Sequence, residues 1–374
     1  MSGTQSKNSR PLRVLMVCTV PTAASGIPMV MFNLLRGMDR SGFEIGYVSI
    51  NEPEERFRRE LEEMGVKVWV VPRKLSSPWT YVWKLTKIAR HYDILHAHGN
   101  SATLLLEMLA AFFAGVKVRG AHSHNTTCTQ KSIDRAARPL FYALCNFRLA
   151  CGEAAGKWLF GKCGFHVINN GVNTERFRFD AVSRQEIRGL LGLKESFAIG
   201  HVGNFVEAKN HPFLIEVFAE VVKRMPEARL LLLGGGDGRD AVVRMVEEKG
   251  LKDKVVFAGS VADTEKYMSA MDIVVMPSLF EGLPLTLVEE QASGLNVLVS
   301  DAVTTQADMT GLLKFKPLED GAESWGEAVA QMLTGYKQEE REKSSACAIK
   351  RIRENRYDIR VVAEELKQIY ISLR

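Results

Sequence analysis

The chain has 374 residues, 46% hydrophobic and 25% charged, with 30 Gly and 12 Pro, a composition that excludes disordered, collagen-like and disulfide-stapled proteins. Its length predicts about two domains, at roughly 150 residues each. Residues 1–172 contain 22 Lys and Arg against 12 Asp and Glu, whereas residues 173–374 contain 27 against 32, so the first part is basic and the second mildly acidic.

The N-terminus, MSGTQSKNSR, is polar and lacks the apolar stretch of a signal peptide. Six cysteines are scattered without a C-x-x-C pair, which predicts neither a zinc knuckle nor a disulfide framework. The longest apolar window, at 104–116, contains Glu107 and is shorter than the about 20 residues that a membrane-spanning helix needs. We therefore expect a cytoplasmic protein.

Short β-branched and aliphatic runs alternate with helical patterns in the first part of the chain. The runs that predict strands are 13–19, 44–50, 66–71, 93–98, 116–122, 147–152 and 166–171. This alternation favours right-handed βαβ units and a parallel sheet that is covered on both faces. Gly and Asn cluster in NNGVNTERF at 169–177, so we expect a first domain at 1–172.

The loop at 19–26 joins the first predicted strand to the first helix and contains Gly26. A single glycine is equally typical of an ordinary turn. The position of the loop at the carboxyl end of a strand is the stronger signal, because open α/β sheets bind ligands there.

Two predicted helices in the basic part, 79–90 and 131–145, mix tryptophan and phenylalanine with basic residues. They fit an interfacial helix that contacts an anionic leaflet, and equally a core-facing helix with a polar edge. The basic part would also suit a phosphorylated substrate or a solvated surface, whereas no nucleic-acid-binding motif is visible. The candidate lipid-diphosphate or membrane contacts are Lys84, Lys87, Arg90, Lys131, Arg135 and Arg138.

Four histidines follow two consecutive strands, in HAHGN at 96–100 and AHSHN at 121–125. Metal binding is one interpretation of this pattern, and buried core histidines are another. No Asp, Glu or Cys accompanies them at ligand spacing, so we predict that they hold no metal.

A second series of strands and helices follows. The predicted strands are 197–203, 229–235, 255–259, 272–277 and 296–301, and the predicted helices are 210–224, 238–249, 263–270, 284–293 and 323–334. We expect a second domain at 173–356 and a terminal helix at 357–374, which docks on the first domain through Val362, Leu366, Ile369 and Leu373. The fold class is therefore α/β, with two Rossmann-like doubly wound sheets that face a central cleft.

The most specific segment is SLFEGLPLTLVEEQASG at 278–294. Glu281 precedes a helix that Pro284 can open, and Glu289 falls in its second turn, about 12 Å away at 1.5 Å per residue. The helix N-terminus between the two acids suits a phosphate. A sugar nucleotide would fit this order of groups, with its hexose at Glu281, its diphosphate at the helix N-terminus and its ribose at Glu289. Alternatively, Glu281 complements the helix dipole, and Glu289 and Glu290 lie on a solvated face.

The same segment resembles the signature of retaining glycosyltransferases of family four, which have the GT-B-type fold and place seven residues between two glutamates. HVGNFVEAKNHPFLIEVFAEV at 201–221 is similar to the first strand, loop and helix of their donor domain. LLLLGGGDG at 230–238 matches the next strand and glycine turn, and 169–177 resembles the domain-joining segment. Together with AHSHN, the resemblance covers most of residues 12–310.

The resemblance implies a hexosyltransferase that uses a UDP-sugar without a metal or other cofactor and acts on a glycan or polyprenyl-diphosphate-linked acceptor. Lys209 would face the donor diphosphate, Glu281 and His124 would position the sugar with His122 as second choice, and Glu289 would bind ribose. Further donor contacts would come from Gly26, Asn204, Gly235, Gly282, Leu283, Pro284 and Leu285.

One position departs from the family pattern, because Asn204 stands where the family usually has arginine. Asparagine donates hydrogen bonds but supplies no charge, so Arg239 or a neighbour would have to replace the second cation. This departure favours one alternative to transfer, a non-catalytic subunit of a glycan-assembly complex. A second alternative is a sugar-nucleotide epimerase, which uses the same two-sheet cleft.

Overall fold

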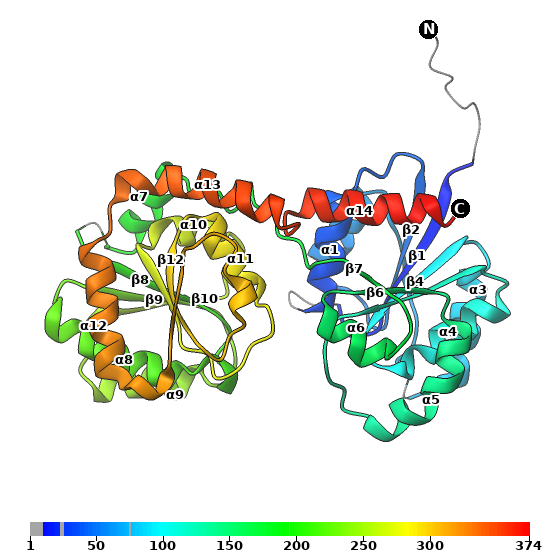
Figure 1. Ribbon diagram of the computed structural model, residues 1–374, viewed down its shortest axis with the longest axis horizontal. Helices are drawn as coiled ribbons and strands as arrows, with labels where there is room; N and C mark the ends of the chain where they lie inside the picture. Colours follow the sequence, from blue (N-terminus) through cyan, green and yellow to red (C-terminus); the bar gives the residue numbers. More distant parts are fainter. Residues whose placement is uncertain (1–9, 23–25, 75, 194) are drawn as a thin grey trace, which may run out of the picture. The chain divides into compact units, whose positions relative to one another are not determined.

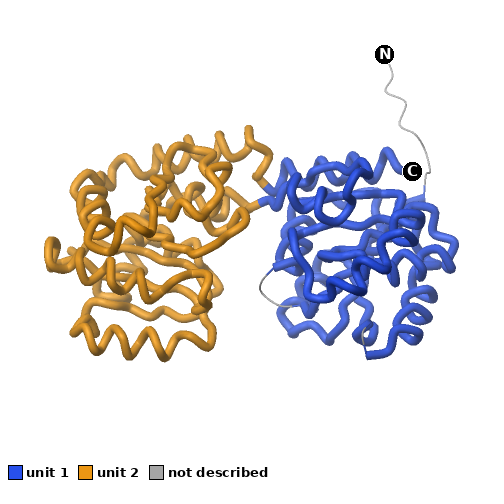
Figure 2. Tube along the Cα trace, turned by 60° about the horizontal axis from the view of Figure 1, so that its bottom comes forward, with its two compact units in different colours: residues 1–171, 359–374 blue, residues 172–358 orange. Residues whose placement is uncertain are grey.

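The computed structural model describes residues 10–22, 26–74, 76–193 and 195–374. The chain divides into two compact units, which Figure 2 shows in separate colours. Unit 1 consists of Met1–Gly171 and Ile359–Arg374, and unit 2 of Val172–Asp358. Each unit has a parallel sheet with helices on both faces (Figure 1), which confirms the predicted α/β class.

Within the described residues, the sheet of unit 1 has seven strands in the order β3-β2-β1-β4-β5-β6-β7. The strands are β1 Leu12–Cys18, β2 Phe43–Ser49, β3 Lys67–Val70, β4 Ile94–Gly99, β5 Val118–Ser123, β6 Phe147–Ala150 and β7 His166–Val167. The helices are α1 Ile27–Gly37, α2 Glu55–Glu63, α3 Pro78–Ala89, α4 Leu105–Phe113, α5 Lys131–Leu144, α6 Glu153–Phe160 and α14 Ile359–Ser372.

Unit 2 contains a six-stranded sheet in the part that the structure describes, in the order β10-β9-β8-β11-β12-β13. Its strands are β8 Ala198–Val202, β9 Arg229–Leu233, β10 Val255–Gly259, β11 Ile273–Met276, β12 Asn296–Ser300 and β13 Leu313–Lys316. Its helices are α7 Ala181–Leu190, α8 His211–Arg224, α9 Arg239–Glu248, α10 Thr264–Ala270, α11 Leu285–Ala292, α12 Gly321–Thr334 and α13 Arg341–Glu354.

The burial of each strand follows its place in the sheet. The central strands β4, β8 and β11 are buried along their whole length, whereas the edge strands β3 and β7 are partly exposed. Strands that are covered on both faces need continuous apolar runs, and this is why the central strands were the clearest in the sequence. In unit 2, Trp325 of α12 and Phe218 of α8 lie fully buried in the core on one face of the sheet.

The terminal helix α14 belongs to unit 1 and packs closely against Gly37 and Gly171. A Cβ atom at Gly37 would lie 2.9 Å from Ile359 Cγ1, and one at Gly171 would lie 2.8 Å from Ile359 Cα. Its buried face includes Val362 and Leu366, as predicted, but continues through Tyr370 and not through Ile369 and Leu373. The predicted stripe was therefore wrong at its end, because the bulky phenol of Tyr370 fills the space beside the sheet.

The six cysteines form no disulfide among the described residues, and the apolar window at 104–116 lies mostly in a short helix. All six cysteines fall within the described residues and carry free thiols. The 104–116 window forms the 3-10 turn Ala102–Leu104 and helix α4, which buries one face against the sheet. Among the helices that the structure describes, none is long and apolar enough to cross a membrane.

Candidate active site

Both sheets reverse their winding direction between two central strands. In unit 2 these strands are β8 and β11, and in unit 1 they are β1 and β4. Open α/β sheets bind ligands outside the carboxyl ends of their strands at such a switch point. Most of the sequence-predicted residues lie on the loops after these strands, on or just after the neighbouring strand β5, and in the first two turns of helix α11, whereas Gly235 follows β9. Each unit is described in turn.

Lys209 and Glu281 meet in unit 2, although they come from different loops. Lys209 ends a 3-10 turn, Glu207–Lys209, after β8, and its Nζ lies 2.7 Å from Glu281 Oε1 in the loop after β11. The lysine stem crosses Gly203, where a Cβ atom would lie 2.9 Å from Lys209 Cε. Both charged side chains are mostly buried, at 14% and 19% exposure, so a cation and an acid are held together at the switch point.

The helix that follows Glu281 begins with an uncapped first turn. Helix α11 begins at Leu285, one residue after Pro284, and no side chain caps it. Its first N–H groups and positive dipole end therefore favour an anion. In the described part of the chain, the buried Thr286 Oγ1 has no hydrogen-bond partner. Leu283 and Leu285 are half-buried, whereas Gly282 is exposed and has open space beside it.

Glu289 lies in the second turn of α11 and is partly exposed. Protein atoms surround its carboxyl group, and this burial raises its pKa to about 7, partly offset by the nearby Arg176 and reinforced by Glu265. Arg176 and Glu265 form an ion pair of their own at 2.9 Å. We therefore expect the Glu289 carboxyl group to change its charge near neutral pH.

The glycine turn after β9 packs against the loop after β8. A Cβ atom at Gly234 would lie 2.0 Å from Gly203 O, and Gly235 N donates a 3.4 Å hydrogen bond to Asn204 Oδ1. The absence of a side chain at Gly234 therefore allows this turn to pack directly against the backbone of Gly203. This contact joins the loops of β8 and β9 into one surface.

No arginine occupies the position of Asn204, and Arg239 does not lie free beside it. Asn204 is exposed, while the Arg239 guanidinium lies 5.3 Å from the Phe257 ring centroid and 3.8 Å from Asp240 Oδ1. A cation over an aromatic face is weakly held at an exposed site. Arg239 therefore already has two partners, Phe257 and Asp240.

In unit 1, Gly26 is exposed and immediately precedes α1. Its φ is 61°, a conformation that favours glycine, and its carbonyl oxygen accepts from Val30 N at 3.3 Å. The preceding residues of the predicted loop, 23–25, lie outside the described residues. Gly26 thus marks the start of α1 near the carboxyl end of β1.

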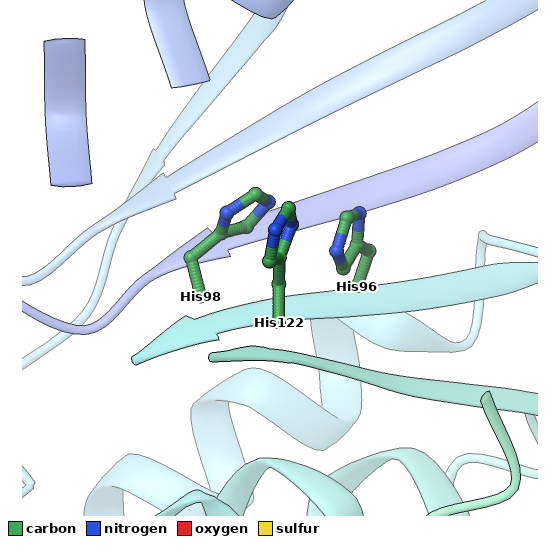
Figure 3. A group of neighbouring side chains, drawn as sticks. All are labelled: His96, His98 and His122. Atoms are coloured by element: carbon green, nitrogen blue, oxygen red, sulfur yellow. The ribbon is translucent and has the colours of Figure 1, made fainter. Parts of the chain in front are cut away.

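Four histidines of unit 1, at positions 96, 98, 122 and 124, form a layered group, of which Figure 3 shows the first three. The His122 and His124 rings stack at a centroid distance of 4.3 Å, and His98 Nδ1 lies 2.9 Å from His124 Nε2. His122 is fully buried and His124 partly exposed. Burial lowers the pKa of His96 and of His124 to about 3, so these rings are neutral at pH 7.

The similarity of the chain to known proteins decides its family. Residues 24–176 match the model described as Glycosyltransferase Family 4, and residues 196–335 match the model described as Glycosyl transferases group 1. A protein of Bacillus subtilis strain 168 named "Putative glycosyltransferase EpsF" is 33% identical over 341 residues, which cover 87% of this chain and 88% of EpsF. The chain is a glycosyltransferase.

Two further similarities bear on this glycosyltransferase. An Escherichia coli protein named UDP-Gal:alpha-D-GlcNAc-diphosphoundecaprenol alpha-1,3-galactosyltransferase is 30% identical over 236 residues, covering 59% of this chain and 60% of that one. The crystal structure of Anabaena Alr3699/HepE in complex with UDP has a TM-score of 0.78 at 20% identity, covering 96% of this chain and 100% of that one. The second similarity shows the shared fold.

Three buried polar residues of the glycosyltransferase were not anticipated as part of the site. Glu290 is fully buried, and neither of its carboxylate oxygens has a partner within the described residues, so the expectation that it could lie on a solvated face is wrong. His201 Nδ1 lies 2.8 Å from Val275 O, and His211 stacks on Phe205 at 4.3 Å. Adjacent residues on a helix point about 100° apart, which is how Glu289 and Glu290 have different surroundings.

We expect Glu290 to make the stability of the glycosyltransferase depend on pH. Burial raises its pKa well above its ordinary value of 4.5, so folding favours the protonated acid, and stability falls as pH rises above about 4.5. Glu290→Gln cannot ionise, and we expect it to unfold at higher urea concentration than wild type at pH 8 but at a similar concentration at pH 5. The control is Glu186→Gln, on the exposed face of α7. Parallel pH profiles for Glu290→Gln and wild type would contradict the prediction.

Proposed function

We propose that this glycosyltransferase moves a hexose from a UDP-sugar to a glycan or lipid-linked oligosaccharide, with retention of anomeric configuration, during surface polysaccharide synthesis in the cytoplasm. The Lys209–Glu281 pair beside the uncapped start of α11 carries this proposal. The similarity to EpsF, and the UDP-sugar and diphosphoundecaprenol in the name of the E. coli relative, support it.

Lys209 would stabilise the negative charge that develops on the leaving diphosphate. Its ammonium group has three N–H donors, so it can hold Glu281 and still donate to phosphate oxygens. The N–H groups at the start of α11 would add donors that need no reorganisation during the reaction. Because these groups supply the positive field, we propose that the diphosphate needs no metal ion.

The reaction itself would need no nucleophilic side chain. The bond between the anomeric carbon and the phosphate oxygen breaks, and the acceptor oxygen forms its bond on the same face of the sugar. The acceptor proton passes to the leaving phosphate oxygen. Glu281 and His124 would hold the sugar hydroxyl groups, with His122 behind His124, and Gly26 would allow backbone to approach the sugar.

The nucleoside would lie farther along α11. Glu289 would accept hydrogen bonds from the ribose hydroxyls in its ionised form, while Gly235, Gly282, Leu283 and Leu285 would contact the nucleotide. Because the pKa of Glu289 is about 7, we expect ribose binding through its ionised form to weaken as the pH falls below 7.

A donor screen tests this function. Thermal shift with UDP, GDP and their common sugars should show stabilisation by a UDP-sugar, and the same sugar should then be transferred to a polyprenyl-diphosphate-linked acceptor. A new sugar nucleotide formed without acceptor would instead indicate an epimerase. UDP binding without hydrolysis or transfer, restored by Asn204→Arg, would indicate a binding subunit.

We also propose a peripheral contact of α3 and α5 with an anionic membrane. Helix α3 buries Tyr81 and Leu85 against the sheet, yet exposes Trp79 at 87% and Trp83 at 56%. Exposed basic side chains, Lys84 and Lys87 on α3 and Lys131 and Arg135 on α5, accompany them. Of the predicted contacts, Arg138 is already engaged, because its Nε donates to Asp134 Oδ2 at 2.8 Å.

Vesicle flotation checks the membrane contact. Wild type should float with phosphatidylglycerol vesicles and much less with phosphatidylcholine vesicles, because both apolar burial and charge contribute. Trp79→Ser/Trp83→Ser should reduce flotation several-fold. Val182→Ser/Leu190→Ser, which removes two exposed apolar side chains of α7, should float like wild type. Equal binding of both double variants would contradict an aromatic contact through α3.

A further inference from the structure

Three fully buried histidines of unit 1 face one another. His96 and His98 lie on β4, two residues apart and hence on the same face of the sheet, and His122 is the register partner of His98 on β5. All three have no exposed surface. Figure 3 shows their side chains on one side of the sheet, with His122 between the other two.

The ring nitrogens of these histidines are only partly used. His96 Nδ1 lies 2.6 Å from Tyr370 Oη, and His98 Nδ1 lies 2.9 Å from His124 Nε2. Nε2 of His96, Nε2 of His98 and both nitrogens of His122 have no partner among the described residues. A buried polar group without a partner costs about 1–3 kcal/mol. A cluster of such groups is therefore expected to have a ligand.

The two hydrogen bonds set the direction of the unused lone pairs. When His96 Nδ1–H donates to Tyr370 Oη and His98 Nδ1–H donates to His124 Nε2, both rings present the Nε2 lone pair. Metal-bound histidines have this arrangement, since the second ring nitrogen donates to a neighbouring acceptor and orients the ring. His122 can supply a third lone pair from either nitrogen.

The spacing fits one metal ion. One ring nitrogen from each of His96, His98 and His122 lies within 4.8 Å of the others. Three imidazoles bound to a single zinc ion at about 2.0–2.1 Å have nitrogens roughly 3.4 Å apart and ring centroids roughly 5 Å apart. The centroids here are 4.2, 5.0 and 5.4 Å apart, close to that spacing.

We propose that His96, His98 and His122 bind a divalent transition metal, with zinc as the expected ion, and that Tyr370 and His124 orient two of its ligands. Imidazole nitrogen is a preferred ligand of zinc. The ion would join β4 to β5 and, through Tyr370, to α14. This structural site shares His122 and His124 with the sugar contact proposed above, and it takes no part in the diphosphate chemistry proposed for Lys209.

Metal analysis of the full chain tests the site. Protein without a polyhistidine tag is unfolded with a chelator to remove any bound metal, and is then refolded with either Zn²⁺ or Co²⁺ as the only added metal. We expect about one ion per chain, a higher Tm with Zn²⁺, and visible absorption bands of nitrogen-ligated Co²⁺. No bound ion, no change in Tm and no cobalt bands in the refolded chain would overturn the proposal.

Variants distinguish this site from chance binding at the surface. His122→Gln should abolish the cobalt bands, and Tyr370→Phe should weaken Co²⁺ binding by about 10–100-fold. The matched control is His91→Gln, at an exposed position, which should keep wild-type affinity. If His122→Gln does not fold, the cobalt titration of Tyr370→Phe still tests whether the ion binds at the three histidines. Wild-type affinity in both His122→Gln and Tyr370→Phe would mean that the ion binds elsewhere.

Discussion

Replacement of Lys209 by methionine is expected to lower the rate of sugar transfer by roughly a hundred- to a thousand-fold, the usual cost of removing one preorganised donor from a transition state. Methionine keeps an apolar stem that can cross Gly203 and removes only the charge. The measurement is kcat and KM for the UDP-sugar, followed by UDP release, with the Tm of each variant. The fall should appear mainly in kcat, because charge on the diphosphate grows as the bond to the sugar breaks.

The matched control is Lys223→Met in the same unit. Lys223 Nζ lies 2.6 Å from Glu220 Oε1, a similar ion pair on the exposed face of α8. We expect it to retain wild-type kcat, and Lys209→Arg to retain part of it because the positive charge remains. Wild-type turnover of Lys209→Met would show that this lysine does not face the reacting diphosphate.

Asp272→Ala is expected to lower the free energy of unfolding of unit 2 by about 3–5 kcal/mol, the usual cost of breaking a buried ion pair from one side. Asp272 is 2% exposed. It accepts from Arg184 Nη2 at 2.5 Å, from Arg188 Nη1 at 3.3 Å and from Ala198 N at 2.7 Å. Its loss leaves two buried guanidinium groups without their carboxylate and removes a link between α7 and β8.

Urea unfolding followed by far-UV circular dichroism measures this effect. Asp240→Ala is the control, because Asp240 is 81% exposed and its ion pair with Arg239 spans 3.8 Å, so its loss should cost less than about 1 kcal/mol. A similar small cost for Asp272→Ala would mean that backbone carbonyls alone hold the two arginines in place.

Apolar runs made most strands predictable. The expected strands at 93–98 and 197–203 correspond to β4 and β8, which are buried throughout. The edge strand β13, Leu313–Lys316, was missed because its sequence, LKFK, alternates with charges. The strand expected at 166–171 ends at Val167, because its remaining residues leave the sheet toward unit 2.

Helices α7 and α13 were missed for a different reason. Helix α7 buries Arg184 and Arg188 beside Asp272, and α13 buries Arg341 and Ser345 together with apolar residues. Prediction from hydrophobic periodicity assumes that the inward face is apolar. Here arginines that donate to carboxylate and carbonyl oxygens occupy much of that face.

The site was predictable only where the order of strands brings residues together. Lys209 and Glu281 each follow a central strand, so their meeting could be expected from the carboxyl edge of a parallel sheet. The burial of Glu290 depends on how α11 rotates against the sheet, and the contact of His96 with Tyr370 depends on where the terminal helix docks. Neither depends on local sequence, so neither was predicted.

The path of the chain has a consequence for its synthesis. Unit 1 is closed by α14, whose Tyr370 packs beside Phe43, Phe147 and His96. Domains generally fold as units during translation, but this one cannot be completed until residues 359–374 have been synthesised. The domain that emerges first is therefore finished last, after the inserted domain has had time to fold, and a nascent chain stalled before residue 359 would keep an apolar groove open for chaperones.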